Sequence, residues 1–304
     1  MRGLTPRQIE AFQAVVLTGG VGAAAALINV TQPAVSRMIR DLQRHLGLAL
    51  FERRGTGLVP TSEALSLYAE VERAFVGLER IAQMATELRT RRAGFLRIAA
   101  LPALANGFLP RFVGSFLKAR PKLDIVLSGL VSHAVLVAVA QGQCDLGFAE
   151  ASMEHANVQR EAMPAAPFVA VLPERHRLAR EKRLRPQDFE GENFISLGPS
   201  TLSRFRIDRV FAEHGVSRIL RIETPLSEIA CALAGSGAGV ALCEPFTATE
   251  YASRGIVVRP FEPRLDFEFA ALYAGQRSVP PVAREFIDGF KAHVTDFLKR
   301  EPWR

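Results

Sequence analysis

The stretch Val21–Gly47, VGAAAALINVTQPAVSRMIRDLQRHLG, decides the fold of the N-terminal part of the chain. Its beginning, residues 21–28, is rich in alanine and predicts a short helix, because small side chains let another helix approach closely. Asn29–Val30 interrupts this helix. We expect the hydroxyl of Thr31 to cap a second helix by accepting a backbone N–H, with Pro33 in the first turn, where its missing N–H costs nothing.

The second helix of this stretch is amphipathic. Its apolar residues recur at helical spacing and predict a buried stripe, formed by Val35, Met38, Ile39, Leu42 and Leu46. Its outer face is polar and cationic, formed by Gln32, Ser36, Arg37, Arg40 and Arg44. A short helix packed on a second helix that presents Gln, Ser and Arg is the geometry that enters the major groove of DNA. An ordinary surface helix that carries a few arginines is the alternative.

The start of this helix and the segment after it carry a specific combination of residues. They are Thr31, Gln32, Pro33, Ala34, Ser36, Leu42, Leu46, Gly47, Leu50, Phe51 and Arg53. In type and spacing they resemble the LysR-type transcriptional regulators, and the resemblance extends from Leu4 to about Tyr68. The chain differs at Thr31, where serine is commoner, and at Gln43, where glutamate is commoner. The resemblance implies a winged helix-turn-helix domain over residues 1–60, promoter DNA as partner, and RNA polymerase as a second candidate partner.

Two short strands, 50–53 and 57–60, are expected to flank the turn 54–56 and form the wing. Arginines on such a hairpin can reach phosphates or the adjacent minor groove, and a solvated basic turn is the alternative. The candidate DNA-binding residues are Thr31, Gln32, Pro33, Ala34, Ser36, Arg37, Arg40, Arg53 and Arg54.

The distribution of charge favours the same function. The chain of 304 residues has a formal net charge of +7 and a pI near 9.8. Residues 1–60 contain seven Arg and three acidic residues, which gives 7 − 3 = +4. More than half of the net charge therefore lies in a fifth of the chain, as expected for binding of an anionic partner.

Residues 61–92 predict one long helix with a wide apolar stripe. The stripe consists of Ala64, Tyr68, Val71, Phe75, Leu78, Ala82 and Ala85. A helix of this kind without a domain around it needs a partner, and a second copy of itself is the simplest one. We therefore expect a homodimer formed through 61–92, with a homotetramer as the larger assembly.

From residue 93 the pattern changes to alternating strands and helices, which predicts parallel, doubly wound sheets. The chain is expected to form two lobes, with lobe 1 at 93–166 and 270–304 and lobe 2 at 167–269. This arrangement resembles the type 2 periplasmic binding proteins, which the LysR family uses as effector-binding domains. The predicted fold is thus a winged helix-turn-helix, a linker helix and a two-lobed α/β effector domain, and the resemblance implies a small-molecule effector between the lobes.

Ligands of open α/β sheets bind beyond the carboxyl ends of the strands. This rule selects Pro102, Ala103, Leu104, Gly129, Leu130, Glu150, Ser200, Thr201, Thr224, Glu244 and Phe246. Helix starts after Ser200 and near Ala103 favour a carboxylate, and Glu150 and Glu244 can hold an ammonium or guanidinium group. We therefore predict an amino acid or an amino-acid conjugate as effector. Alternatively, the two glutamates cap neighbouring helices.

Part of this region also resembles one branch of the family. The segments 101–112 and 223–246 are similar to those of regulators that sense opines and arginine-related compounds. In that branch a shorter Asp is common at the position of Glu244, so the resemblance does not fix the ligand.

Other classes of function fit less well. The six histidines are scattered, and no Gly-x-Ser-x-Gly elbow is present, so we expect no enzyme. The three cysteines (Cys144, Cys231 and Cys243) lack metal-ligand spacing, and no metal or cofactor is expected. A transport receptor would need an export signal. The sequence has no such signal and no apolar run of about 18 residues, so a cytoplasmic protein without membrane contact is expected. A DNA-binding protein that responds to no ligand remains the alternative.

Overall fold

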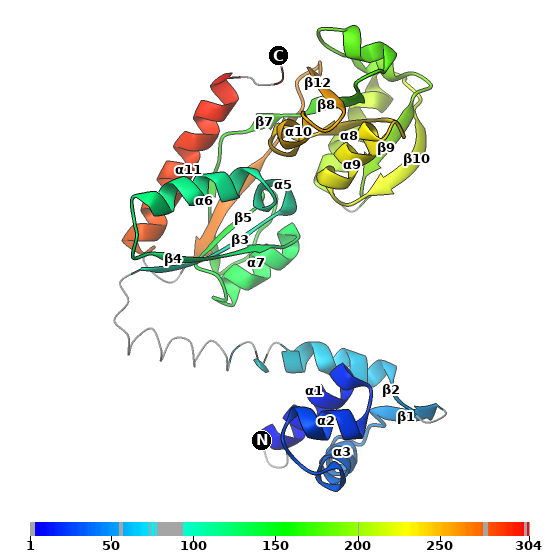
Figure 1. Ribbon diagram of the computed structural model, residues 1–304, viewed down its shortest axis with the longest axis vertical. Coiled ribbons are helices and arrows are strands. Elements are labelled where there is room, and N and C mark those ends of the chain that lie inside the picture. The colour runs from blue at the N-terminus through cyan, green and yellow to red at the C-terminus, as the bar shows by residue number, and fades with distance from the viewer. Residues whose placement is uncertain are drawn as a thin grey trace. The chain divides into compact units, whose positions relative to one another are not determined.

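The computed structural model describes residues 4–54, 57–72, 74–75, 77, 94–199, 201–275, 279–300 and 303. The chain divides into two compact units, residues 1–91 and 92–304 (Figure 1). Each unit has its own hydrophobic core and is described by itself.

The N-terminal unit is a three-helix domain with a β-hairpin. Its elements are α1 (Pro6–Thr18), α2 (Val21–Leu27), α3 (Gln32–Leu46), β1 (Phe51–Arg54) and β2 (Gly57–Pro60). The two strands are antiparallel, with Phe51 opposite Pro60. Phe12, Val35 and Leu42 are fully buried between the helices. The helix-turn-helix and the hairpin predicted from the sequence are therefore present.

The break between α2 and α3 depends on a left-handed residue. Asn29 has a φ of 53°, which lets the chain turn sharply, and the N–H of Val30 donates to the carbonyl of Ala25 at 3.0 Å. Asn tolerates this conformation better than most residues because its short side chain can bond locally.

The expected cap by the hydroxyl of Thr31 is wrong. Thr31 is the N-cap residue of α3, but its side chain makes no capping hydrogen bond. A side-chain cap needs the N–H of the second or third helical residue. Pro33, the second, has no N–H, and the N–H of Ala34 donates to the carbonyl of Thr31 at 3.0 Å. The main chain thus replaces the predicted side-chain cap.

The helix after the hairpin contributes to the core of the N-terminal unit. Residues 62–72 are helical, and Ala64 and Val71 are buried against this core. Tyr68 lies edge-on to Phe12, with ring centroids 6.5 Å apart. The first part of the predicted stripe therefore covers the domain, contrary to the expectation that no domain surrounds it. The stripe from residue 78 onward lies outside the described residues.

The C-terminal unit contains two five-stranded sheets, one in each lobe. The order in lobe 1 is β4-β3-β5-β14-β6, and the order in lobe 2 is β10-β9-β11-β8-β12. The strands of lobe 1 are β3 (Phe95–Ala100), β4 (Asp124–Gly129), β5 (Leu146–Glu150), β6 (Val158–Ala162) and β14 (Phe269–Ala274). Those of lobe 2 are β8 (Val169–Pro173), β9 (Asn193–Leu197), β10 (Ile219–Thr224), β11 (Val240–Cys243) and β12 (Ile256–Pro260).

Both sheets are mixed. The three strands of lobe 1 predicted to be parallel, β3, β4 and β5, are parallel, whereas the prediction is wrong for β8 of lobe 2. In lobe 1, β14 runs antiparallel to β5 and β6, and in lobe 2, β8 runs antiparallel to β11 and β12. A parallel neighbour requires a crossover connection, usually a helix. The chain instead passes between the lobes through the short antiparallel strands β7 (Ala166–Pro167) and β13 (Asp266–Phe267), and β14 follows directly.

Helices cover the sheets of both lobes (Figure 1). They are α5 (Pro102–Ala105), α6 (Phe108–Lys118), α7 (Ser132–Ala140), α8 (Leu202–Glu213), α9 (Ser227–Gly235), α10 (Pro245–Tyr251) and α11 (Pro281–Arg300), with 3-10 turns η1 (Arg177–Arg180) and η2 (Pro186–Phe189). The predicted closing helix is α11, whose buried Phe290 contacts Phe148 of lobe 1 at 4.9 Å between ring centroids. Farther along α11, Phe297 stacks on Phe246 of α10 at 5.5 Å.

Candidate functional site

The outer face of α3 is free of the protein core. Gln32, Arg37 and Arg40 are exposed, and Ala34 and Ser36 are half-buried. The side chain of Arg37 is 83% exposed, and its Nε lies 3.7 Å from Asp41 Oδ2. Exposed pairs of this kind contribute little to stability, so the guanidinium can exchange its partner for a DNA base at small cost. Thr31 and Pro33 are also exposed, at the start of the helix.

Gln43 joins α3 to the wing, a role that the sequence analysis missed. Its side-chain oxygen accepts hydrogen bonds from the backbone N–H groups of Leu50 (2.8 Å) and Phe51 (3.2 Å). Arg53 and Arg54 follow in β1, opposite Leu58 and Gly57, and their side chains lie outside the described part of the structure. The amide oxygen of Gln43 thus fixes the hairpin relative to the polar helix.

In the C-terminal unit, a cavity of about 370 Å³ lies between the two lobes, within the size range of small-molecule sites. Lobe 1 contributes Leu101, Pro102, Ala103, Val131, Ser132, His133, Glu150 and Met153. Lobe 2 contributes Leu197, Thr201, Ser203, Pro225, Leu226, Ser227 and Glu244, and Phe267 comes from the connection.

Five of the eleven predicted ligand-binding residues line this cavity: Pro102, Ala103, Glu150, Thr201 and Glu244. The structure does not bring Leu104, Gly129, Leu130, Thr224 and Phe246 to it, and Ser200 lies outside the described residues. Leu104 and Phe246 are fully buried in the core, because each occupies the face of its helix that packs inward. Thr224 is buried, Leu130 packs against core residues of lobe 1, and Gly129 lies against Ala105.

Glu150 is the more accessible carboxylate of the cavity. Its Oε1 accepts a long hydrogen bond, 3.4 Å, from the hydroxyl of Ser203 in the other lobe. Burial raises the pKa of Glu150, and the Ser203 hydroxyl, Arg206 and the backbone amides of Ser203 and Leu202 oppose this rise. The carboxylate of lobe 1 therefore lies near the first turn of α8 in lobe 2, where amide groups favour an anion.

Glu244 is both a helix cap and a wall of the cavity. It is 2% exposed, and its Oε1 accepts from the N–H of Thr247 at 3.2 Å, as an N-cap of α10. Its Oε2 accepts from the hydroxyl of Ser227 at 2.7 Å. Burial raises the pKa of Glu244, against the effect of these hydrogen bonds. The capping role left open by the sequence is therefore present, and each oxygen keeps a lone pair for a further partner.

Three serine hydroxyls of the cavity were not predicted from the sequence. Ser132 and Ser227 are the first residues of α7 and α9, and Ser203 is the second residue of α8. The hydroxyl of Ser132 accepts from the N–H of Glu150 at 3.2 Å. A serine that begins a helix directly after a strand was the available signal, because such positions lie at the same sheet edge as the predicted loops.

Other chemistry is not indicated by the described residues. No group of three or more His, Cys, Asp and Glu residues among them could hold a metal ion. Cys231 and Cys243 are buried and unpaired as disulfides. The interaction with Cys231, together with burial, raises the pKa of Cys243 well above its ordinary value, which disfavours the reactive thiolate.

Among the described helices, none is by itself long and apolar enough to span a membrane. Among these helices, only α1 and α2 taken together have the length and composition of a membrane span, and the chain bends by 119° between them.

Comparison with protein families confirms the resemblance. Residues 6–65 match the bacterial regulatory helix-turn-helix family of LysR, and residues 89–295 match the LysR substrate-binding domain. The chain belongs to the LysR family of transcriptional regulators. It is thus a ligand-responsive DNA-binding regulator of transcription and not an enzyme.

Individual relatives cover nearly the whole LysR-type chain. It is 43% identical to the octopine catabolism/uptake operon regulatory protein OccR of Rhizobium meliloti over 289 residues, which is 94% of this chain and 95% of that protein. It is 35% identical to the transcriptional activator LysR of Escherichia coli K12 over 97% of this chain and 93% of that protein. The crystal structure of the LysR-family regulator CbnR is similar in fold, with a TM-score of 0.77 at 17% identity, and covers 95% of this chain and 99% of CbnR.

Proposed function

We propose that this regulator binds operator DNA through α3 and the wing, and that a small zwitterionic effector, an amino acid or an amino-acid conjugate, switches it by binding between the lobes. The cavity between the lobes is the main support for this class of effector. It contains a half-buried carboxylate, Glu150, that faces the amide-rich start of α8 across the gap between the lobes.

The contact between Glu150 and α8 favours a ligand with both charges. An effector's ammonium or guanidinium group pairs with Glu150, and its carboxylate takes the position near Ser203 and the amides of α8. Such a ligand replaces a long direct contact, 3.4 Å, with two charge-assisted ones. Similarity to a relative named for octopine, a derivative of arginine, supports this class of effector.

For DNA, we assign base contacts to Gln32, Ala34, Ser36 and Arg37, and phosphate contacts to Arg40 and the wing residues Arg53 and Arg54. Thr31 and Pro33 place the start of α3 at the groove. Two such domains held together by residues 61–92 read a partly palindromic operator, and contacts between C-terminal units extend the dimer to a tetramer. Effector binding changes the spacing of the reading domains and thereby DNA bending and the contact with RNA polymerase in the cytoplasm.

The test has two arms. In the first, purified protein is mixed with duplex DNA from upstream of its own gene at low salt, and its mass is measured at micromolar concentration. We expect an oligomer that binds this DNA more tightly than unrelated DNA, and a monomer without affinity for either refutes the proposal. In the second, octopine, L-arginine and other amino acids are screened by thermal shift. A ligand raises the melting temperature by mass action, and no shift with any of them refutes the zwitterionic effector.

A further inference from the structure

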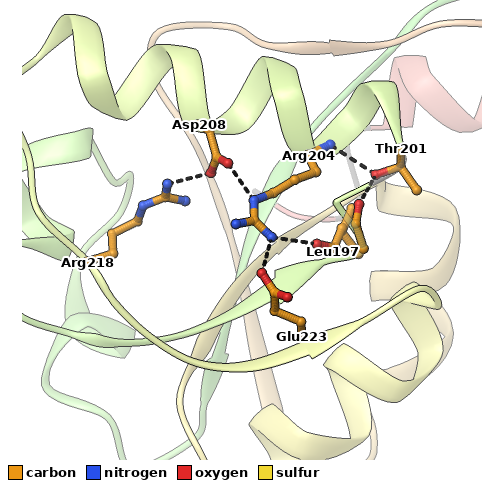
Figure 2. A network of polar contacts seen from close by, with 7 residues as sticks. Leu197, Thr201, Arg204, Asp208, Arg218 and Glu223 are labelled. Atoms are coloured by element: carbon orange, nitrogen blue, oxygen red, sulfur yellow. Dashed lines mark hydrogen bonds and ion pairs between the residues drawn. The ribbon is translucent and has the colours of Figure 1, made fainter.

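One buried arginine connects the two loops of lobe 2 that line the cavity. Arg204, in the first turn of α8, is 9% exposed. Its Nη1 donates to the carbonyl of Leu197 at 2.9 Å and to Glu223 Oε1 at 2.7 Å, and its Nε donates to Asp208 Oδ2 at 2.5 Å (Figure 2). Leu197 ends β9, and Glu223 is the last residue but one of β10. The guanidinium thus spans the carboxyl ends of two neighbouring strands.

Both strands lead directly into the wall of the cavity. Leu197 lines the cavity at the end of β9, and Thr201 and Ser203 line it after this strand. After β10, the lining residues are Pro225, Leu226 and Ser227. The backbone N–H of Arg204 also donates to the hydroxyl of Thr201 at 3.1 Å, and this hydroxyl donates to the carbonyl of Gly198 at 2.9 Å. The first loop is therefore folded around both the main chain and the side chain of Arg204, as Figure 2 shows.

The rest of the network keeps this guanidinium charged and anchored. Burial lowers the pKa of Arg204, but the hydrogen bonds with Glu223 and Asp208 outweigh this effect, so the pKa is raised. The second oxygen of Asp208 accepts from Arg218 at 2.6 Å, and the Arg218 guanidinium lies 3.9 Å from the centroid of the buried Phe211 ring. Asp208 is thereby tied to the core of lobe 2.

We propose that Arg204 is a positioning residue for effector recognition: its guanidinium fixes the loops after β9 and β10 relative to each other, so that the hydroxyls of Ser203 and Ser227 face Glu150 and Glu244 with one geometry. A fixed geometry matters because effector affinity depends on hydrogen bonds that need not be reorganised on binding. The inference rests on the proposed effector site but makes a separate claim about which group shapes it. Arg204 itself does not touch the effector.

The test compares Arg204→Lys with the control Arg209→Lys on the same helix. Arg209 is 61% exposed and pairs only loosely with Glu213, at 3.5 Å. Lysine at position 204 keeps a positive charge but loses the planar fork that serves three acceptors. The full-length variants are compared by amide hydrogen exchange, by calorimetric titration with octopine and L-arginine, and by thermal unfolding.

For Arg204→Lys we expect faster exchange of the amides at 201–203 and 226–227 and an affinity for the bound probe that is weaker by tenfold or more. Exchange in β8 and β11 and the affinity for DNA stay as in the wild type. Arg209→Lys changes none of these quantities. Unchanged exchange in both loops overturns the proposal, as does an unchanged affinity when the wild type binds a probe.

Two further comparisons separate the possible failures. If the wild type binds neither probe, octopine and L-arginine are excluded as effectors, and the exchange of the two loops still decides whether Arg204 positions them. If Arg204→Lys does not fold, Glu223→Gln replaces it, since this variant loses only the charge at the end of β10 and keeps the bonds of Arg204 to Leu197 and Asp208. Faster exchange confined to the two loops then supports the proposal, and wild-type exchange overturns it.

Discussion

Glu150→Gln is the sharpest test of the charge of the effector. The substitution keeps the size of the side chain and an oxygen that accepts from the Ser203 hydroxyl, and it removes only the negative charge. Hydrogen bonds that involve a charged group contribute about 1.5–3 kcal/mol, and neutral ones about 0.5–1.5 kcal/mol. The difference of roughly 1–1.5 kcal/mol predicts an affinity about five- to tenfold weaker for an effector whose cation meets Glu150.

The assay is calorimetric titration with three related probes. L-arginine carries a guanidinium and an ammonium group, L-citrulline lacks the charged guanidinium, and Nα-acetyl-L-arginine lacks the ammonium. We expect Glu150→Gln to weaken the affinity for arginine by the predicted factor. The affinity for the analogue that lacks the cation that meets Glu150 falls much less. The control is Glu154→Gln, because Glu154 is exposed, pairs with Arg160 at 2.8 Å and lies outside the cavity. Equal losses for all three probes refute the pairing of a cation with Glu150.

Four further outcomes are expected. Burial raises the pKa of Glu150, so the affinity for arginine increases as the pH rises from the ordinary carboxyl range through this raised pKa and then levels off. The affinity of Glu150→Gln for arginine lacks this increase. Burial raises the pKa of Glu244 in the folded protein, so protonation of this carboxyl stabilises the fold, and this stabilisation is lost as the pH rises through the raised pKa. Glu244→Gln is neutral at every pH. We therefore expect it to unfold at a higher temperature than the wild type at neutral pH and at the same temperature in acid. Arg37→Ala costs about 1–3 kcal/mol of operator affinity and alters the sequence preference. Arg40→Ala weakens the affinity for all duplexes alike and lowers the slope of log affinity against log salt concentration by about one, as measured by binding assays at several salt concentrations. Asn29→Ala destabilises the N-terminal unit by about 1–2 kcal/mol in denaturant unfolding, and Asn29→Gly does not, because φ at this position is 53°.

The sequence was most informative where local rules decide the structure. The positions of α2 and α3, the break at Asn29 and the hairpin followed from helix periodicity and turn residues. The predicted cap by Thr31 failed for an equally local reason: Pro33 has no N–H, and the N–H of Ala34 donates to the main-chain carbonyl of Thr31 instead of its hydroxyl. The direction of β14 could not be predicted, because it depends on a return of the chain from lobe 2 about 120 residues after β5.

For the cavity, the strand-end rule selected the correct loops but not the side chains that face inward. Ala103 and Leu104 are neighbours on α5, yet only Ala103 lines the cavity, because adjacent helical residues point about 100° apart. Serine hydroxyls that begin helices were available in the sequence and would have improved the prediction. The network around Arg204 could not be predicted from the sequence, since it joins residues 197, 204 and 223 through tertiary contacts alone.

The two sides of the contact between the lobes differ in chemistry, and this difference explains how a small effector can act as a switch. On one side, Phe246 of lobe 2 packs on Phe108 of lobe 1 and on Phe297. The ion pair between Arg111 of α6 and Glu250 of α10 lies beside these rings, with the Arg111 guanidinium 6.0 Å from the Phe108 centroid. On the cavity side, the contacts are polar and replaceable: Ser203 with Glu150, and Asn106 with Glu228 at 2.7 Å. Separating the aromatic contact exposes apolar surface to water, whereas the polar groups exchange protein partners for water or ligand at small net cost. Motion of the lobes is therefore expected to pivot near the aromatic contact and to open and close at Glu150, where a bound effector biases the equilibrium by its preference for one arrangement, typically about 1–3 kcal/mol.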